Sequence, residues 1–180
     1  MALSATVYNL AVELADVDRG AYTSLELRIA RHPSETPEYL LTRLLAYCLE
    51  YTEGIAFTDG VSAVDEPAVL VRDLTGRITA WIEVGAPSAA RLHRGSKAAK
   101  RCAIYTHRDP AQVLALYAAE RIHRADAIPL YSFGRGYIER VTATLARRAK
   151  LAVSRTDGQL YLDVDGTTHA TTVEEHRLVP

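Results

Sequence analysis

The stretch DEPAVLVRDLTGRITAWIEVG, residues 65–85, decides the fold of this chain. It predicts a β-hairpin with arms at 68–73 and 77–84, because a Thr-Gly pair separates two runs rich in β-branched and aliphatic residues. Successive side chains of a strand point to opposite faces. In the second arm, Ile82 and Val84 therefore share one face, and Trp81 and Glu83 share the other.

Three carboxylates mark one end of this hairpin. Asp65 and Glu66 stand at the head of the first arm, and pairing of the arms brings them near Glu83. Carboxylates that converge in this way are typical ligands of Mg²⁺. The alternative is structural: Glu83 lies on a solvated strand face, and Asp65, Glu66 and Pro67 form an ordinary turn.

Composition is that of a water-soluble globular chain. The 180 residues are 48% hydrophobic and 24% charged, with a net charge of −1, so only a local basic patch would attract nucleic acid. The sequence contains no run of about 18 apolar residues, so it predicts no membrane-spanning helix. The pattern at the N-terminus predicts a strand rather than a signal peptide. Cys48 and Cys102 have neither metal-ligand nor disulfide spacing. We therefore expect two structural thiols in a protein of the reducing cytoplasm.

The other elements follow from hydrophobic periodicity. The sequence predicts strands at 2–17, 21–31, 55–58, 102–105, 128–132, 151–155, 160–164 and 167–173. It predicts helices at 37–54, 88–100, 109–123 and 134–150. The expected fold is α/β (α+β), a mixed sheet in a single domain 1–180, with strand pairs at both ends of the chain flanking a core at 34–132.

The predicted helix 88–100 and the residue that follows it are basic. The residues concerned are Arg91, His93, Arg94, Lys97, Lys100 and Arg101. Such a face is usually only solvated. Together with the acidic hairpin and Glu35, however, it suits phosphodiester hydrolysis, in which a cation activates water and a positive group offsets charge on the phosphate.

Three motifs resemble the YaeQ family of small bacterial proteins. They are RHPSE at 31–35, DEP at 65–67 and WIEVG at 81–85, on a chain of this length that begins MALSATVY. The resemblance implies a fold similar to the PD-(D/E)xK nuclease core, an α-β-β-β-α-β arrangement with long edge strands added. The resemblance does not imply a particular biochemical activity, because the family has no settled one.

The same resemblance assigns roles to single residues. Glu35 corresponds to the glutamate of the core's first helix, Asp65 or Glu66 to the first acid of the motif, and Glu83 to its second acid. The motif lysine belongs at position 85, where this chain has Gly85. As in some nucleases of this superfamily, a lysine of the following helix can replace it, and Lys97 or Lys100 is the candidate.

Two hypotheses of different classes result. The first is a Mg²⁺-dependent nuclease with Asp65, Glu66 and Glu83 as metal ligands, Glu35 orienting water or a ligand, and Lys97 stabilising phosphate charge. Its nucleic-acid-binding residues are Arg91, Arg94, Lys100 and Arg101. The second is a non-catalytic module that binds nucleic acid or a transcription-related protein, with its acids paired to arginines. A small-molecule hydrolase using the same metal pocket is a third possibility.

Overall fold

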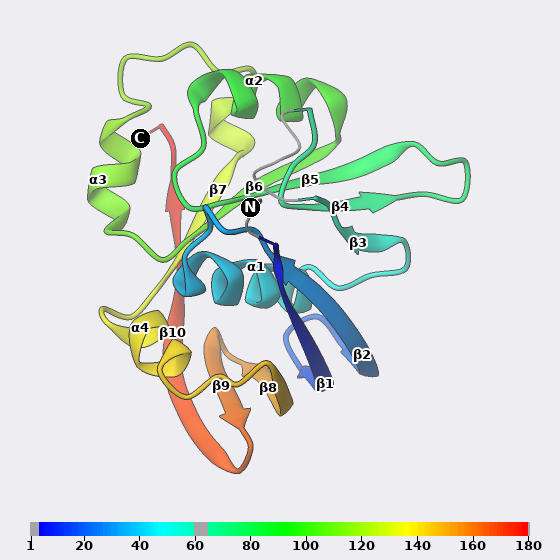
Figure 1. Cartoon of the computed structure of the whole chain (residues 1–180). Helices are drawn as coiled ribbons and strands as arrows, with labels where there is room; N and C mark the ends of the chain where they lie inside the picture. Colours follow the sequence, from blue (N-terminus) through cyan, green and yellow to red (C-terminus); the bar gives the residue numbers. More distant parts are fainter. Residues whose placement is uncertain (1–3, 60–64, 180) are drawn as a thin grey trace.

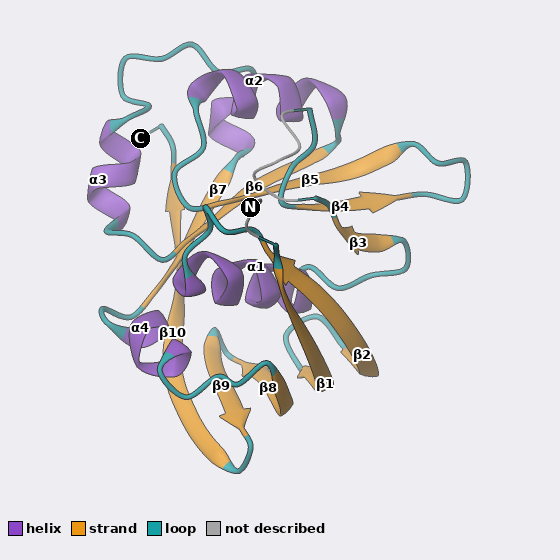
Figure 2. Cartoon of the chain, in the orientation of Figure 1, coloured by secondary structure: helices purple, strands orange, loops and turns teal. Residues whose placement is uncertain are grey.

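The protein is described by a computed structural model that covers residues 4–59 and 65–179. Its helices and strands, drawn in Figures 1 and 2, are β1 (Thr6–Asp16), β2 (Ala21–Arg31), α1 (Pro37–Leu49), β3 (Ile55–Phe57), β4 (Val69–Arg72), β5 (Ile78–Val84), α2 (Ala89–Ala98), β6 (Arg101–Thr106), α3 (Pro110–Ala115), the 3-10 helix η2 (Ala125–Ala127), β7 (Pro129–Phe133), α4 (Tyr137–Thr142), β8 (Arg148–Thr156), β9 (Gln159–Val164) and β10 (Thr167–Arg177).

One mixed sheet of ten strands runs through the described chain, in the order β2-β1-β8-β9-β10-β7-β6-β5-β4-β3. The pairs β1–β8, β5–β6 and β6–β7 are parallel, and the other pairs are antiparallel. Strand β10 joins the two halves, because Thr167–Thr172 pairs with β9 and Val173–Arg177 pairs with β7. The expected α+β class with a mixed sheet is confirmed, and both terminal strand groups add to the same side, beyond β7.

Helix α1 lies in the middle of the molecule, between the two halves of a sheet that is curved nearly into a closed layer (Figure 1). It begins at Pro37, as the sequence predicts, and the Thr36 Oγ1 accepts a hydrogen bond of 3.1 Å from the Tyr39 amide. Every residue from Leu40 to Leu49 is buried. Such a helix has no solvent-facing stripe, so the curved sheet must cover it on several sides.

The parallel strands β5, β6 and β7 are covered on both faces. On one face, Ile82 and Val84 join the core around α1; on the other, Trp81 packs in a second core with Leu92 of α2. The alternation predicted for the second hairpin arm is confirmed. Since β5 and β6 run in the same direction, their carboxyl ends lie together at one edge of the sheet.

The predicted helix 134–150 is wrong over most of its length. Helix α4 covers Tyr137–Thr142 alone, and residues from Arg148 onward form β8. In β8, Ala149, Leu151 and Val153 are buried in alternation, and the strand pairs with β1 and β9. Pairing with a strand from the other end of the chain has overridden the local helical pattern.

Other element boundaries also differ from the sequence prediction. Helix α1 ends at Leu49 rather than near residue 54, and α3 ends at Ala115 rather than near 123. Beyond α3, the Tyr117 hydroxyl donates to the Pro87 carbonyl oxygen at 2.7 Å, which draws the chain inward. The predicted strand 167–173 continues to Arg177 because its second half pairs with β7.

Two Asp-Gly turns join the C-terminal strands β8, β9 and β10. Asp157 and Gly158 both have positive φ, at 51° and 74°, and Asp165 and Gly166 have 48° and 95°. Two successive residues of this kind match the right-handed twist of the strands that they join. Among the helices of the described chain, none has the length and apolar character needed to cross a bilayer.

Candidate functional site

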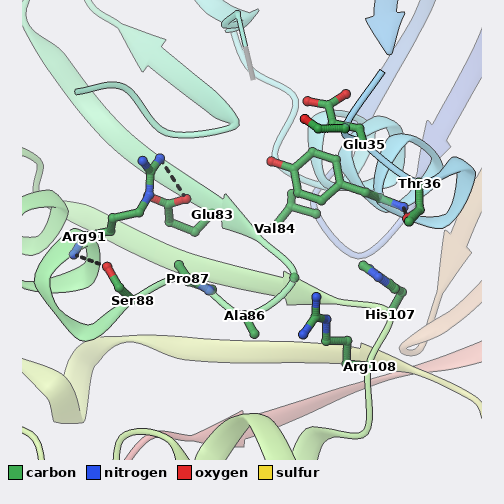
Figure 3. Close-up of a pocket in the computed structure, with 13 residues that line it drawn as sticks. Glu35, Thr36, Glu83, Val84, Ala86, Pro87, Ser88, Arg91, His107 and Arg108 are labelled. Atoms are coloured by element: carbon green, nitrogen blue, oxygen red, sulfur yellow. Dashed lines mark hydrogen bonds and ion pairs between the residues drawn. The ribbon is translucent and has the colours of Figure 1, made fainter. Parts of the chain in front are cut away.

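A pocket of about 400 Å³ lies where β5 and β6 end. Its walls come from the segment that leads into α1, the end of β5, the first turn of α2 and the residues after β6, and we call it the strand-end pocket (Figure 3). Ligands of α/β sheets commonly bind outside the carboxyl ends of parallel strands. The position of this pocket in the fold makes it the candidate functional site.

Glu83 enters the pocket from β5 and is almost fully buried, at 3% exposure. Its Oε1 accepts hydrogen bonds from the Trp81 indole at 2.8 Å and from Arg91 Nε at 3.1 Å, and its Oε2 accepts from Arg91 Nη2 at 3.3 Å. Burial raises the pKa of this carboxyl, and the charge of Arg91 and the two donors offset part of that effect. The negative charge of Glu83 is thus balanced from within the protein.

Glu35 lies on the other side of the pocket from Glu83 (Figure 3), and Tyr39 lines the pocket as well. Glu35 is also buried, at 4% exposure, and its Oε2 accepts a hydrogen bond of 3.0 Å from the His32 amide. The Arg31 guanidinium donates to the Glu35 carbonyl oxygen at 2.8 Å, which fixes the backbone there. Burial raises the pKa of Tyr39 to about 12, so its hydroxyl stays protonated and can donate into the pocket.

Gly85 stands at the position of the missing motif lysine, and its backbone explains the glycine. Its φ is +83°, a left-handed conformation that side chains disfavour. A Cβ there would lie 3.8 Å from His107 Cε1 and 3.9 Å from Tyr39 Cδ2. The backbone itself thus opposes a lysine at this point.

His107 and Arg108 follow the end of β6 and line the same pocket. Burial lowers the pKa of His107, and the neighbouring Arg108 charge lowers it further. The His107 Nδ1 is buried without a hydrogen-bond partner among the described residues. Figure 3 shows the Arg108 guanidinium between Ala86 and His107, where it supplies positive charge to the pocket.

Asp65 and Glu66 are paired elsewhere. Asp65 forms an exposed ion pair with Arg94 at 2.6 Å, and Glu66 lies 3.7 Å from Arg72. Neither lines the strand-end pocket beside Glu83. Within residues 4–59 and 65–179, no group of three or more His, Cys, Asp or Glu residues is placed to hold a metal ion.

The basic residues of the α2 region separate into different settings. Arg91 pairs with Glu83, Arg94 pairs with Asp65, and Arg101 pairs with Glu50 at 2.6 Å. Lys97 and Lys100 instead line another hollow, at the opposite end of α2 from Arg91. The five basic side chains therefore do not form one continuous face, and Lys97 does not line the pocket that holds Glu83.

Comparison with known proteins identifies the family of this chain. The family model described as YaeQ protein matches residues 1–173. The chain belongs to the YaeQ family. The YaeQ protein of Escherichia coli K12, described as uncharacterised, is 32% identical over 166 residues, which is 92% of each chain. Its counterpart from Salmonella typhi is 40% identical over 111 residues, 62% of this chain and 61% of that one.

Two crystal structures of YaeQ proteins share the fold. The protein from Xanthomonas axonopodis pv. citri is 27% identical, with a TM-score of 0.87 over 98% of this chain and 100% of that chain. The protein from Pseudomonas syringae is 31% identical, with a TM-score of 0.83 over 95% of both chains. The curved mixed sheet around a buried helix is therefore a shared architecture of these YaeQ proteins.

Sequence reasoning picked out Glu35, Glu83 and Arg91, which all line this pocket of the YaeQ-family chain, but it missed Arg108. The available signal was its position immediately after a buried strand in a strand–helix–strand alternation, where ligand contacts gather. Chemically, Arg108 and the two helix starts can bind an oxyanion through charge-assisted hydrogen bonds, while Arg91 is engaged by Glu83.

Proposed function

We propose that the protein binds nucleic acid through phosphate groups in the strand-end pocket, as a non-catalytic module on a nuclease-like core. The core order supports this: α1-β3-β4-β5-α2-β6 follows the α-β-β-β-α-β order of PD-(D/E)xK proteins. The pairings agree as well, with β4 antiparallel and β6 parallel to β5.

The observation that carries the proposal is the pairing of Glu83 inside the pocket. Both of its oxygens accept from Arg91, and Oε1 also accepts from Trp81. The buried acid is thus neutralised by its own arginine, while Arg108 is left to face the ligand. Phosphate oxygens are the natural partners of an arginine in this position.

A Mg²⁺ ion does not fit the arrangement described. A metal ligand needs free oxygen lone pairs, and N–H donors engage three of the roughly four lone-pair sites of the Glu83 carboxylate. Asp65 and Glu66 are paired with Arg94 and Arg72 outside the pocket. The three acids that correspond to the motif thus form ion pairs with arginines.

A metal-dependent phosphodiesterase is the second candidate, and one observation favours it. Glu35 and Glu83 line the same pocket from opposite sides, and together they would supply two carboxylates if Arg91 turned away from Glu83. Calorimetric titration of Mg²⁺ and Mn²⁺ into the wild type and Glu83→Ala distinguishes the two. Metal binding that disappears in Glu83→Ala, with cleavage of an oligonucleotide by the wild type, supports the phosphodiesterase and contradicts the binding module.

The binding proposal is tested with a fluorescent single-stranded oligonucleotide of about 12 nucleotides, a length within the site sizes of single-strand-binding folds. We expect Arg108→Ala to weaken binding about tenfold, because a charge-assisted hydrogen bond is lost. Arg28→Ala, which removes an exposed arginine from β2, is the matched control and keeps wild-type affinity. No binding by the wild type, or equal losses in both variants, would rule out this use of the pocket.

A further inference from the structure

A second hollow, of about 480 Å³, lies at the far end of α2. Its walls are the last turn of α2, the turn of the β4–β5 hairpin and residues 123–124. Four of its lining residues are basic: Arg77, Lys97, Lys100 and Arg124. We call it the basic hollow; it shares no lining residue with the strand-end pocket.

The positive charge of the basic hollow exceeds the negative charge around it. In the described part of the chain, none of its four basic side chains forms an ion pair with a carboxylate. The residues outside that part carry no Asp or Glu. The other basic residues of α2, Arg91 and Arg94, are by contrast paired with acids.

The acidic side chain at the rim, Asp73, is already occupied. Its Oδ1 accepts hydrogen bonds from the Thr75 amide at 2.9 Å, the Thr75 hydroxyl at 2.6 Å and the Arg77 amide at 3.1 Å. These bonds, led by that of the Thr75 hydroxyl, and the charge of Arg77 lower the pKa of Asp73, although burial opposes them. Asp73 therefore holds the hairpin turn, and the positive charge of the hollow exceeds its negative charge.

A helix C-terminus would normally repel an anion, because its free carbonyl oxygens carry partial negative charge. Here Arg124 covers them: its Nη2 donates to the carbonyl oxygens of Ser96 at 2.8 Å, Ala99 at 2.9 Å and Lys100 at 3.2 Å. Arg124 itself has a positive φ of 49°, a backbone conformation that is uncommon for residues other than glycine. The end of α2 is thereby neutralised and held in place.

We infer that the basic hollow binds phosphate groups, of either a free polyphosphate or a nucleic-acid strand. Lys97 and Lys100, three residues apart in sequence, supply mobile ammonium groups, and Arg124 supplies a fixed guanidinium beside them. Arg77 approaches from the hairpin side. Since this site and the strand-end pocket have no residue in common, it stands independently of the proposed function.

The test uses the double variant Lys97→Gln/Lys100→Gln and two probes, inorganic tripolyphosphate and the single-stranded oligonucleotide. Both lysines are exposed, so the fold is kept, and Arg124 is left to hold the helix end. Arg148→Gln/Lys150→Gln removes the same charge from exposed positions of β8 and is the control. We expect tripolyphosphate binding to weaken about tenfold in the first variant alone, consistent with two lost charge-assisted contacts.

The affinities of the two probes distinguish a nucleic-acid strand from a free polyphosphate. A nucleic-acid strand is identified if the oligonucleotide binds more tightly than tripolyphosphate at equal phosphate concentration. In that case the slope of log affinity against log salt should also become shallower by about 0.7 per lost contact in the lysine variant. Tighter binding of tripolyphosphate identifies a free polyphosphate. The inference is overturned if the wild type binds neither probe, if the lysine variant binds both as the wild type does, if the control loses as much, or if poly-glutamate binds equally well. A response to Arg108→Ala alone would support the strand-end pocket and contradict the basic hollow.

Discussion

Two arginine–glutamate pairs lie on opposite faces of the parallel strands, and their geometry differs. Glu50 at the end of α1 accepts from Arg101 Nε at 2.7 Å, from Arg101 Nη2 at 2.6 Å and from the Tyr105 hydroxyl at 2.8 Å. Glu83 has the same kinds of partner, one arginine and one aromatic donor. Its two bonds to Arg91 are longer, however, at 3.1 and 3.3 Å.

The difference separates a structural pair from one that can exchange its partner. Arg101 meets Glu50 with two parallel bonds, the arrangement that stabilises such a pair best. Arg91 shares its Nη2 between Glu83 and the Glu66 carbonyl oxygen, at 2.6 Å from the latter. Burial still raises the pKa of Glu83, which means that the ion pair has not fully offset the cost of its charge.

The largest effect is expected at the Glu50 pair. Glu50→Gln should lower the free energy of unfolding by about 3 kcal/mol, because it removes the buried charge that Arg101 holds with two short bonds and leaves one of those Arg101 donors facing an amide nitrogen. This figure is at the low end for such pairs since the Arg101 side chain is 43% exposed. Urea denaturation measures it. Glu53→Gln, at an exposed position nearby, is expected to change stability by less than about 0.5 kcal/mol.

The same substitution at the other pair should cost less. Glu83→Gln removes a buried charge and keeps an acceptor for the Trp81 indole, so we expect a loss of about 1 kcal/mol. Trp81 is the chain's one tryptophan, and its fluorescence reports unfolding and the local environment together. Equal losses in Glu50→Gln and Glu83→Gln would mean that the two pairs are energetically alike.

The smallest effect concerns pH at the strand-end pocket. The folded pKa of His107 lies below its usual value of about 6.5, so the unfolded chain takes up the proton first as the pH falls. His107 therefore contributes stability above about pH 6.5 that is lost as the pH falls through its folded pKa. His107→Gln should lose less stability than the wild type between about pH 7.5 and pH 5.5, as measured from urea midpoints. A drop of the same size in the variant would show that His107 does not titrate in this range.

Local signals in the sequence were sufficient for the hairpin and for α1. The alternation in the second arm and the start of α1 at Pro37 depend on neighbours within a few residues, and both predictions are confirmed. Strand β8 was mistaken for helix because its pattern makes sense only beside β1. The residues that join there, such as Asp157 donating its amide to Asp18, are 139 positions apart.

For the site, residue types could be predicted but their partners could not. Arg91 was assigned to a basic face that would contact nucleic acid, yet its side chain turns inward to Glu83. The rotation of α2 decides this, and close contact with the sheet fixes that rotation. A Cβ on Gly95 would come within 2.4 Å of Trp81 Cδ1, so the helix can approach the indole only at the glycine. No spacing in the sequence reveals which face of α2 that glycine will present.

The parallel pairing of β1 with β8 also has a consequence for biosynthesis. The hairpin of β1 and β2 leaves the ribosome long before β8, and β1 finds its second neighbour only when residues 148–156 have been made. Until then β1 presents an unpaired edge, which in other chains promotes association between strands. Contacts so distant in sequence also slow folding. The nascent chain is therefore expected to depend on chaperone protection until β8 emerges, which ribosome-bound chains stalled before and after β8 would reveal by their protease sensitivity.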